Sequence, residues 1–384
     1  MSILFFLILL LFYPTNCLSS QVKEYVIFDN RTDRSEDIVY ISFLGDYELT
    51  KDRYNAMDNQ SKRDMKLLLN YLNKYGLIVI NFEFQIPKSD IFAVKLLSNS
   101  GVDAAIIANN HSCDYGKTYL FENEKRLFNY GIQPIGVKKY PYWRLTTRGN
   151  IYTIYGLTET LDVYCNEVNM TRDKNLGETL ANLAHDSDVL IVFAHDPGPS
   201  VYITDYEEEK AKYFFTLGAD LVIMTGPHTI KGARRYNGKL AIFSLGNFLL
   251  SYRGIDEFIS IAAIVGFEKD QIVYFSIIPF YDQCGKVFRL LKDYEFNDAV
   301  KKYIDRSTAS YRMAYKNSLT KKLIFESLSG FIRGKNLDRI RAKHVIIFIK
   351  FIYYNYFWYS ILAIIFITSI LAIILFKLFH PKKN

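Results

Sequence analysis

Cysteine is scarce in this chain of 384 residues, which contains only four: Cys17, Cys113, Cys165 and Cys284. Cys17 lies in an amino-terminal segment that is interpreted below as a signal peptide, so the other three remain in the mature chain. An odd number excludes complete pairing within one molecule, and the spacing matches no zinc motif. A disulfide between Cys165 and Cys284 is compatible with an oxidising compartment, but the spacing does not test it.

The chain also lacks any block of like charge long enough to indicate a nucleic-acid partner. Lys and Arg number 47 against 40 Asp and Glu, and the formal net charge is only +7. With 50% hydrophobic and 23% charged residues, the composition is that of a globular protein with room for one large domain or two ordinary ones. We therefore expect no nucleic acid among its partners.

Both ends of the chain are apolar. Residues 3–12 form an unbroken apolar run before the small, polar stretch 15–20, which predicts a secretory signal peptide over residues 1–20, although no Lys or Arg precedes the run. Residues 351–376 carry no charge and, at about 1.5 Å per residue, exceed a bilayer core of about 30 Å, which predicts a transmembrane helix. A core helix of a soluble domain is the alternative.

The two predicted terminal segments together indicate a localisation. With the amino terminus exported, the short basic tail 377–384 would lie in the cytoplasm and the main domain outside it, in a single-pass protein of the cell membrane. Basic residues between positions 333 and 350 would then lie on the outer side, which departs from the positive-inside rule.

Short apolar runs alternate with longer amphipathic stretches from residue 38 onward, which predicts an α/β domain with a largely parallel sheet. Six runs are predicted as its strands: 38–44, 77–82, 104–108, 151–157, 189–194 and 221–224. Five stretches between them are predicted as helices: 62–75, 90–98, 117–130, 176–185 and 205–217. Three later runs, 240–243, 259–267 and 272–278, predict a second and more antiparallel sheet.

This pattern predicts one domain over residues 38–285. Beyond it, basic and apolar positions alternate at helical spacing, which predicts a helical juxtamembrane connector over residues 286–344. A disordered linker is the competing interpretation.

Polar side chains end five of the predicted strands. Because parallel strands place their carboxyl ends on one edge of a sheet, residues far apart in the sequence can meet there. Carboxylates, an Asn side chain and imidazoles can bind one or two divalent metals, which would activate water and polarise a phosphoryl or carbonyl oxygen. The groups are Gly45-Asp46, Asn81-Phe82-Glu83, Asn109-Asn110-His111, His195-Asp196 and Gly226-Pro227-His228.

Each group also has a structural alternative. Asp46 can cap a helix, Glu83 can pair with a surface Lys, and the loop around His111 can be a capped turn. His195 and His228 can be hydrogen-bonded core histidines. Three of the six histidines nevertheless stand at equivalent strand ends, a pattern that favours one shared site.

Four motifs resemble the CapA family of poly-γ-glutamate capsule biosynthesis proteins in their order and spacing. They are Gly45-Asp46, Asn81-Phe82-Glu83, the stretch from Ala108 to Gly116, and Ser244-Leu245-Gly246-Asn247-Phe248. The resemblance covers residues 38–279. This family resembles calcineurin-like metallophosphatases, so it implies a four-layer α/β/β/α sandwich, in which two sheets pack face to face and helices cover both outer surfaces.

The resemblance also implies roles for individual residues. His111 would be a general acid, and Asn109 and Asp114 would support its loop, while Asn247 would line the same edge. The ligands of one or two divalent ions, such as Mn²⁺, Zn²⁺ or Mg²⁺, would be Asp46, Glu83, Asn110, His195 and His228.

The chain departs from the family pattern at three places. His195 is followed by Asp196 and Pro197 where the family usually has Trp-Gly followed by a Glu. Thr225 stands where many members have His, and Glu48 stands where the wider metallophosphatases have His. These departures leave open a one-metal site, a two-metal site and a binding module without catalysis.

Three basic residues after His228 predict a rim that attracts anions: Lys231, Arg234 and Arg235. A solvated loop is the alternative.

The sequence as a whole predicts a function. We expect a membrane-anchored CapA-like protein that works with capsule-assembly proteins to assemble, export or tether an anionic surface polymer such as poly-γ-glutamate. The rival interpretations are a metal-dependent phosphoesterase or hydrolase with a phosphorylated substrate, and a non-catalytic binding or scaffold module on the same fold.

Overall fold

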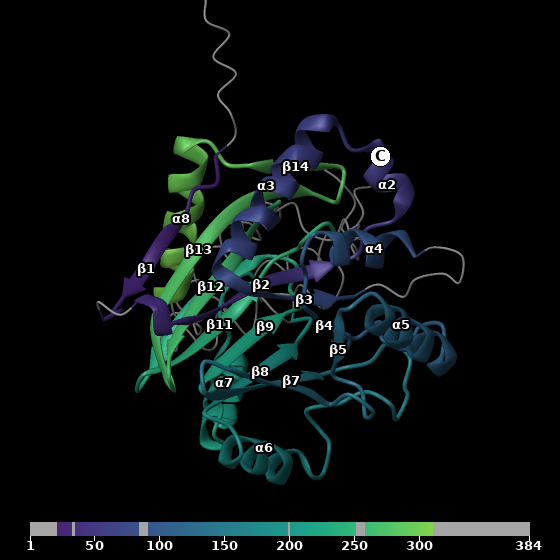
Figure 1. The fold of residues 1–384 in the computed structure, drawn as a ribbon, viewed down its shortest axis with the longest axis vertical. Helices are drawn as coiled ribbons and strands as arrows, with labels where there is room; N and C mark the ends of the chain where they lie inside the picture. Colours follow the sequence, from purple (N-terminus) through teal and green to yellow (C-terminus); the bar gives the residue numbers. More distant parts are fainter. Residues whose placement is uncertain (1–20, 33–34, 84–90, 199, 251–257, 310–384) are drawn as a thin grey trace, which may run out of the picture. The chain divides into compact units, whose positions relative to one another are not determined.

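The computed structural model describes residues 21–32, 35–83, 91–198, 200–250 and 258–309, which contain two β-sheets (Figure 1). The larger sheet has eight strands, in the spatial order β1 (Tyr25–Asp29), β13 (Gln271–Gln283), β12 (Ile259–Glu268), β2 (Val39–Tyr47), β3 (Gly76–Phe82), β4 (Ala104–Ile106) and β5 (Gln133–Ile135), with β14 (Val287–Leu290) paired to β13. The smaller sheet has six, in the order β10 (Ile230–Tyr236), β11 (Lys239–Leu245), β9 (Leu221–Thr225), β8 (Val189–His195), β7 (Asn150–Thr158) and β6 (Tyr142–Thr147).

The centre of each sheet is parallel. Strands β2 to β5 are parallel in the larger sheet, and β7, β8, β9 and β11 are parallel in the smaller one. These strands are apolar runs that are buried along most of their length, as β8 is at every residue, which is typical of strands covered on both faces.

The two sheets pack against each other through one hydrophobic core. The ring of Phe43 in β2 lies 6.2 Å from that of Phe193 in β8, centroid to centroid, and Tyr152 in β7 lies 5.7 Å from Phe267 in β12. A second, smaller core lies between the other face of the six-stranded sheet and its helices. The predicted mixed α/β architecture is therefore confirmed.

Helices lie on both sheets. α3 (Asn59–Tyr75), α4 (Phe92–Asn99) and α5 (Lys117–Asn129) accompany the larger sheet, and α6 (Leu176–His185) and α7 (Asp205–Thr216) pack on the smaller one (Figure 1). α3 shows why they form. The Asp58 side chain caps its first turn by accepting a hydrogen bond from the Ser61 N–H at 2.6 Å, and a buried stripe containing Met65, Leu69 and Leu72 repeats at helical spacing.

The strands are divided between the sheets differently from the prediction. The six early strands do not form one sheet, because β2 to β4 belong to the larger sheet and β7 to β9 to the smaller one. The late hairpin of β12 and β13 does not start a second sheet either, since β12 pairs with β2. Apolar periodicity reports that a strand is buried but does not specify its partner.

The described part of the predicted connector, residues 286–309, contributes to the folded domain, and its remainder, residues 310–344, lies outside the described residues. β14 pairs with β13, and α8 (Asp293–Thr308) packs against β10 and β13 with Val300 and Tyr303 buried. The predicted signal peptide, transmembrane helix and tail, residues 1–20, 351–376 and 377–384, lie outside the described residues. No helix among the residues that the structure describes is both long and apolar enough to span a membrane.

The disulfide in the structure is not the Cys165–Cys284 bond considered from the sequence. Cys165 is bonded to Cys113, with the two Cα atoms 6.3 Å apart, and Cys284 is a buried thiol in the turn before β14. Sequence spacing could not reveal this pairing, because the loops after β4 and β7 meet only when the two sheets pack together.

Candidate metal centre

The site begins where β2 of the larger sheet touches the segment after β11 of the smaller one. Gly45 allows this approach, since a Cβ atom there would lie 1.8 Å from the carbonyl oxygen of Gly246. The Asp46 N–H donates to that same oxygen at 3.2 Å, and the Phe248 N–H donates to the Asp46 carbonyl at 2.7 Å. The contact places Asp46 beside Asn247, so the ends of strands from both sheets share one edge.

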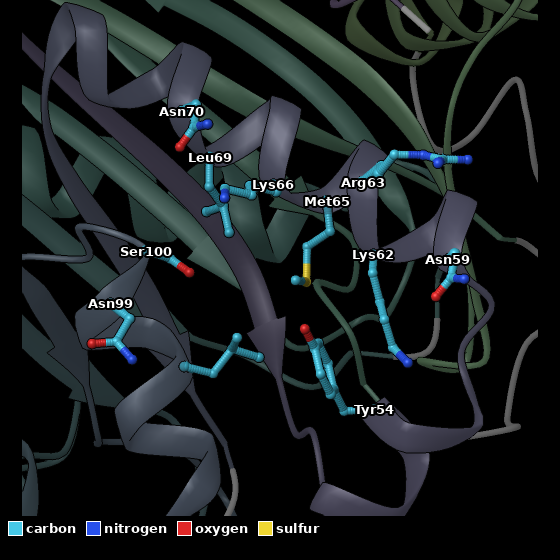
Figure 2. A pocket seen from close by; sticks show the side chains of 11 residues that line it. Tyr54, Asn59, Lys62, Arg63, Met65, Lys66, Leu69, Asn70, Asn99 and Ser100 are labelled. Carbon is cyan, nitrogen blue, oxygen red and sulfur yellow. The ribbon is translucent and has the colours of Figure 1, made fainter.

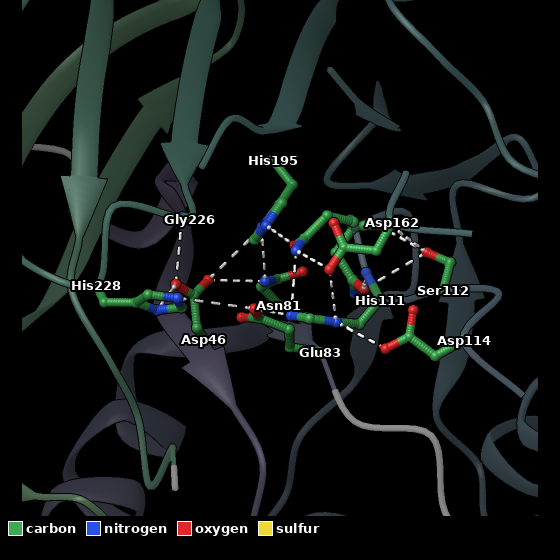
Figure 3. Close-up of polar contacts among 12 residues, drawn as sticks. Asp46, Asn81, Glu83, His111, Ser112, Asp114, Asp162, His195, Gly226 and His228 are labelled. Atoms are coloured by element: carbon green, nitrogen blue, oxygen red, sulfur yellow. Dashed lines mark hydrogen bonds and ion pairs between the residues drawn. The ribbon is translucent and has the colours of Figure 1, made fainter. Parts of the chain in front are cut away.

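Asp46, Glu83 and His228 form the centre of this edge (Figure 3). One ligand atom from each lies within 4.8 Å of the others. The Asp46 Oδ2 atom is 3.1 Å from Nδ1 of His228, and Glu83 Oε1 is 4.0 Å from His228 Nε2. His228 has a φ of 57°, a left-handed conformation that costs energy in a residue other than glycine and is common at functional sites.

Asn81 joins this group to His195. Its Nδ2 atom donates to Asp46 Oδ1 at 2.7 Å and lies 3.1 Å from Nδ1 of His195. His195 Nδ1 is also 3.2 Å from the hydroxyl of Thr225, the residue that replaces a family histidine. The Asn81 side chain thus fixes a carboxylate of the larger sheet relative to an imidazole of the smaller one.

Asn110 and His195 face each other across the two sheets. The Nε2 atom of His195 lies 2.8 Å from Oδ1 of Asn110, so this nitrogen carries the hydrogen and donates it. The Asn110 Nδ2 atom lies 3.1 Å from Nε2 of His111. Both predicted ligands therefore reach the edge, but in this structure they contact each other.

His111 lies at the more open side of the site, with 40% of its side chain exposed. Its Nδ1 atom is 2.8 Å from Oδ2 of Asp114 and its Nε2 atom is 3.9 Å from Oε1 of Glu83. Asn109 connects the loop of His111 to the end of β3, since its side chain donates to the Phe82 carbonyl at 2.9 Å and accepts from the His111 N–H at 3.2 Å. Asp114 and Asn109 thus both contact the loop of His111, and Asn247 Oδ1 lies 3.0 Å from His228 Nδ1.

The charges at the centre perturb one another strongly. Burial, reinforced by the negative charge of Asp46, raises the pKa of Glu83 well above its usual value, and Glu48 and Asp162 add to the effect. Burial opposes charging of His228, but its bond to Asp46 and the charge of Glu83 outweigh it and raise the pKa of His228 to about 9. Burial lowers the pKa of His195 to about 4, so its imidazole is neutral.

These residues suit a divalent cation. Among the described residues, Oε2 of Glu83 and Oδ1 of Asn81 are buried without a hydrogen-bond partner, a costly arrangement for an oxygen atom. A carboxylate whose ionisation is opposed by a neighbouring carboxylate is stabilised by a cation between them. The donor set of two carboxylates and an imidazole matches Mn²⁺ or Zn²⁺, and Mg²⁺ would use mainly the oxygen atoms.

The basic rim predicted after His228 does not form. The ammonium group of Lys231 is fully buried in an ion pair with Glu207, and Arg234 pairs with Glu208 and donates to the Ser307 carbonyl at 3.1 Å. The Arg235 guanidinium lies 4.3 Å from the ring centroid of Phe28. All three residues lie on β10, an edge strand against which α8 packs. Lys231 and Arg234 are paired with carboxylates of α7, and Arg235 is exposed, so one cation of the predicted rim is left on the surface.

Two functional positions escaped the sequence prediction. Asn81 was part of a motif without an assigned role, and the available signal was its position two residues before Glu83 at the end of a predicted strand. Asp162 lies in the loop after β7, and its Oδ2 atom is 3.4 Å from His111 Nδ1. No local pattern marks Asp162, because only the packing of the two sheets brings its loop to the site.

The family model for the bacterial capsule synthesis protein PGA_cap matches residues 40–252. The chain belongs to this family. The matched PGA_cap region contains every residue of the centre described above, and the resemblance to the CapA family is confirmed at this level. None of the curated proteins compared with the sequence matches it.

Solved structures that match this chain include three bacterial proteins. A hypothetical protein from Thermus thermophilus is 17% identical over 64% of this chain and 100% of its own, with a TM-score of 0.44. A putative 5'-nucleotidase from Staphylococcus aureus, in complex with alpha-ketoglutarate, is 13% identical over 70% of this chain and 58% of its own, with a TM-score of 0.47. A phosphatase from Mycoplasma pneumoniae is 14% identical over 67% and 98%, with a TM-score of 0.41.

Proposed function

We propose that this PGA_cap protein handles an anionic surface polymer during capsule synthesis, and that a divalent metal bound by Asp46, Glu83 and His228 is part of its site. The observation that carries the proposal is the buried Glu83 carboxylate, which has an unsatisfied oxygen and faces Asp46 and His228. When a metal binds, Asn110 and His195 would give up their contact with each other, and both would become ligands. When bound, the metal would polarise a phosphoryl or carbonyl oxygen and lower the pKa of a coordinated water.

A groove between α3 and α4 supports the proposal that the ligand is anionic (Figure 2). Its volume is about 510 Å³, with an apolar floor that includes Met65 and Leu69, and Lys62, Arg63 and Lys66 line it. Lys62 lies over the Tyr54 ring at 5.0 Å, and Arg63 donates to the neutral side chain of Gln60 at 2.7 Å.

None of the three cations in this groove forms an ion pair with a carboxylate of the described part of the chain. Lys62, Arg63 and Lys66 therefore present their charges to the groove, whereas Lys231 and Arg234 are paired with Glu207 and Glu208. A polycarboxylate such as poly-γ-glutamate would place acidic groups along such a surface, and its amide bonds could use neighbouring Asn side chains such as Asn59 and Asn99.

Export and membrane anchoring remain part of the proposal. The apolar segments 1–20 and 351–376 support a secreted domain that is held at the cell membrane by one helix. This location would bring the metal centre and the groove to the polymer outside the cytoplasm, where capsule-assembly proteins would be its partners.

The metal proposal is tested with the full-length protein purified in detergent from metal-replete medium. Elemental analysis should find Mn, Zn or Mg, and calorimetric titration should detect binding that Glu83→Ala abolishes. Glu178→Ala, which changes an exposed carboxylate on α6, should bind metal like the wild type. Absence of metal and of binding in the wild type would reject the one-metal and two-metal versions and favour a metal-free scaffold.

The cellular role is tested separately. Deletion of the gene should reduce surface polymer or its attachment, and unchanged polymer would reject this role.

A metal-dependent hydrolase is the second candidate, and the position of His111 favours it. The imidazole is accessible and its Nε2 atom faces the Glu83 carboxylate at 3.9 Å, where it could protonate a leaving group. Turnover of a phosphate ester or of the polymer should require metal and should be lost in His111→Ala. His185→Ala, at an exposed histidine on α6, should retain it. Activity that survives His111→Ala would reject His111 as the acid.

A further inference from the structure

The disulfide connects loops that belong to different sheets. Cys113 lies in the loop after β4 of the larger sheet, two residues beyond His111. Cys165 lies in the loop after β7 of the smaller sheet, three residues beyond Asp162. Each side of the covalent link therefore carries a residue of the site.

Asp162 meets the loop of Asn110 and His111 from the opposite sheet. Its backbone N–H donates to the Asn110 carbonyl at 2.8 Å, and its Oδ2 atom accepts from Asn110 Nδ2 at 3.3 Å. The same oxygen lies 3.4 Å from Nδ1 of His111. Because the Asp162 side chain is 54% exposed, these contacts by themselves would hold the loop weakly.

The disulfide spans the same gap as the contact between Asn110 and His195. The loop that contains Asp162 is also connected to the smaller sheet at its start, where the Glu159 N–H donates to the His195 carbonyl at 2.9 Å. We infer that the Cys113–Cys165 disulfide, with Asp162 as a positioning residue, holds Asn110 against His195 and keeps His111 beside Asn110, so that metal affinity depends on whether the disulfide is intact. This inference rests on the proposed metal centre.

A reductant can reach this disulfide. A cavity of about 300 Å³ is lined by both cysteines and by residues that include Lys117, Tyr164 and Glu167. Cys113 is buried and Cys165 is half-buried. An external dithiol would act by thiolate attack on one sulfur, with the other cysteine leaving as a thiolate. Its second thiol then closes a new disulfide in the reductant, and the protein takes up two electrons and two protons as two thiols.

The test compares Mn²⁺ binding by the oxidised and reduced full-length protein. Mn²⁺ prefers oxygen and nitrogen ligands, so the released thiols should not add a strong site. A phosphine reductant, which becomes the phosphine oxide by taking oxygen from water, is removed before anaerobic calorimetry. We expect reduction to weaken Mn²⁺ binding about fivefold or more, within the usual range of coupling between two sites, and reoxidation to restore it.

Variants separate this effect from the chemistry of free thiols. Cys113→Ser/Cys165→Ser should bind Mn²⁺ as weakly as the reduced protein, and Cys284→Ser should bind it like the wild type. Asp162→Ala should weaken binding, and Asp162→Asn, which keeps an oxygen acceptor for Asn110, should recover most of it. Thermal unfolding confirms that each variant is folded.

Mn²⁺ binding and reduction of the disulfide are thermodynamically linked, which provides a second measurement. If the oxidised protein binds Mn²⁺ fivefold more tightly, saturating Mn²⁺ must make the disulfide fivefold harder to reduce, a shift of about 21 mV for a two-electron couple. Equal Mn²⁺ affinity of the oxidised and reduced proteins, with an unshifted midpoint, would overturn the inference and leave the metal centre standing. Absence of Mn²⁺ binding to the oxidised wild type would overturn both.

Discussion

The Nδ1 atom of His228 lies 3.1 Å from Oδ2 of Asp46, although Asp46 lies in β2 of the larger sheet and His228 follows β9 of the smaller one. The pair is nearly closed to solvent and lies beside Glu83, whose own carboxylate is buried. Two carboxylates and one imidazole therefore converge where the sheets meet, and the properties of this centre can be tested by changing the residues that position or charge it.

Asn81→Ala should weaken metal binding without removing a ligand. The Asn81 side chain holds both Asp46 and His195, and loss of a group that orients ligands typically reduces metal affinity by about 10-fold to 100-fold. Calorimetric titration with Mn²⁺ measures the change. Asn129→Ala, at an exposed residue of α5, is the matched control and should leave the affinity unaltered. Equal affinities for the two variants would contradict the role given to Asn81.

Glu83→Gln should change how the stability of the metal-free protein depends on pH. Burial and the charge of Asp46 raise the pKa of Glu83 in the folded state, so the folded protein holds a proton that the unfolded chain releases from about pH 4.5 upward. The free energy of unfolding should therefore fall as the pH rises above this value, until the folded-state pKa is passed.

The glutamine variant cannot ionise and should lose this part of the pH dependence. Chemical denaturation of both proteins in chelator between pH 5 and 8 measures it. If the wild type loses no stability relative to Glu83→Gln over this pH interval, the ionised Glu83 carboxylate is already stabilised by its neighbours in the absence of metal.

The triple variant Lys62→Gln/Arg63→Gln/Lys66→Gln should bind poly-γ-glutamate more weakly, by about tenfold at low salt, if each charge contributes about 0.5 kcal/mol. Added salt should reduce the difference, because exposed charges are screened. Lys117→Gln/Lys125→Gln/Lys174→Gln removes the same charge from exposed positions elsewhere and is the control. If both triple variants lose affinity equally, net charge is responsible and not the groove.

Gly45→Ala should destabilise the protein by about 3 kcal/mol or more, a size expected when a core contact cannot relax. The added Cβ would lie 1.8 Å from the Gly246 carbonyl oxygen, so the contact that holds Asp46 beside Asn247 must open. Gly177→Ala is the control, because the nearest atom to its added Cβ is 3.8 Å away and its helical position favours alanine. Denaturant unfolding compares the two, and similar midpoints would reject the proposed close contact.

Much of the local structure could be predicted from the sequence. The helix at 176–185 was predicted with its observed ends, and the six early strands were found because each is a short apolar run. β5 was missed because it has three residues and contains Pro134, and β10 because its lysine and two arginines gave it the pattern of a solvated segment. Their burial depends on α8 and on the second sheet, which local patterns do not report.

The polar groups at strand ends were also visible in the sequence, and with the motifs they identified the family and the edge of the sheets where the site lies. Only the tertiary structure decided that these strand ends come from two sheets, that Asn81 connects them, and that Cys113 pairs with Cys165. It also decided that Lys231 is buried in an ion pair while Lys62, Arg63 and Lys66 line a groove. The physical reason is that side-chain periodicity encodes burial along a strand, whereas the partner of a buried or charged group is chosen by contacts between segments far apart in the chain.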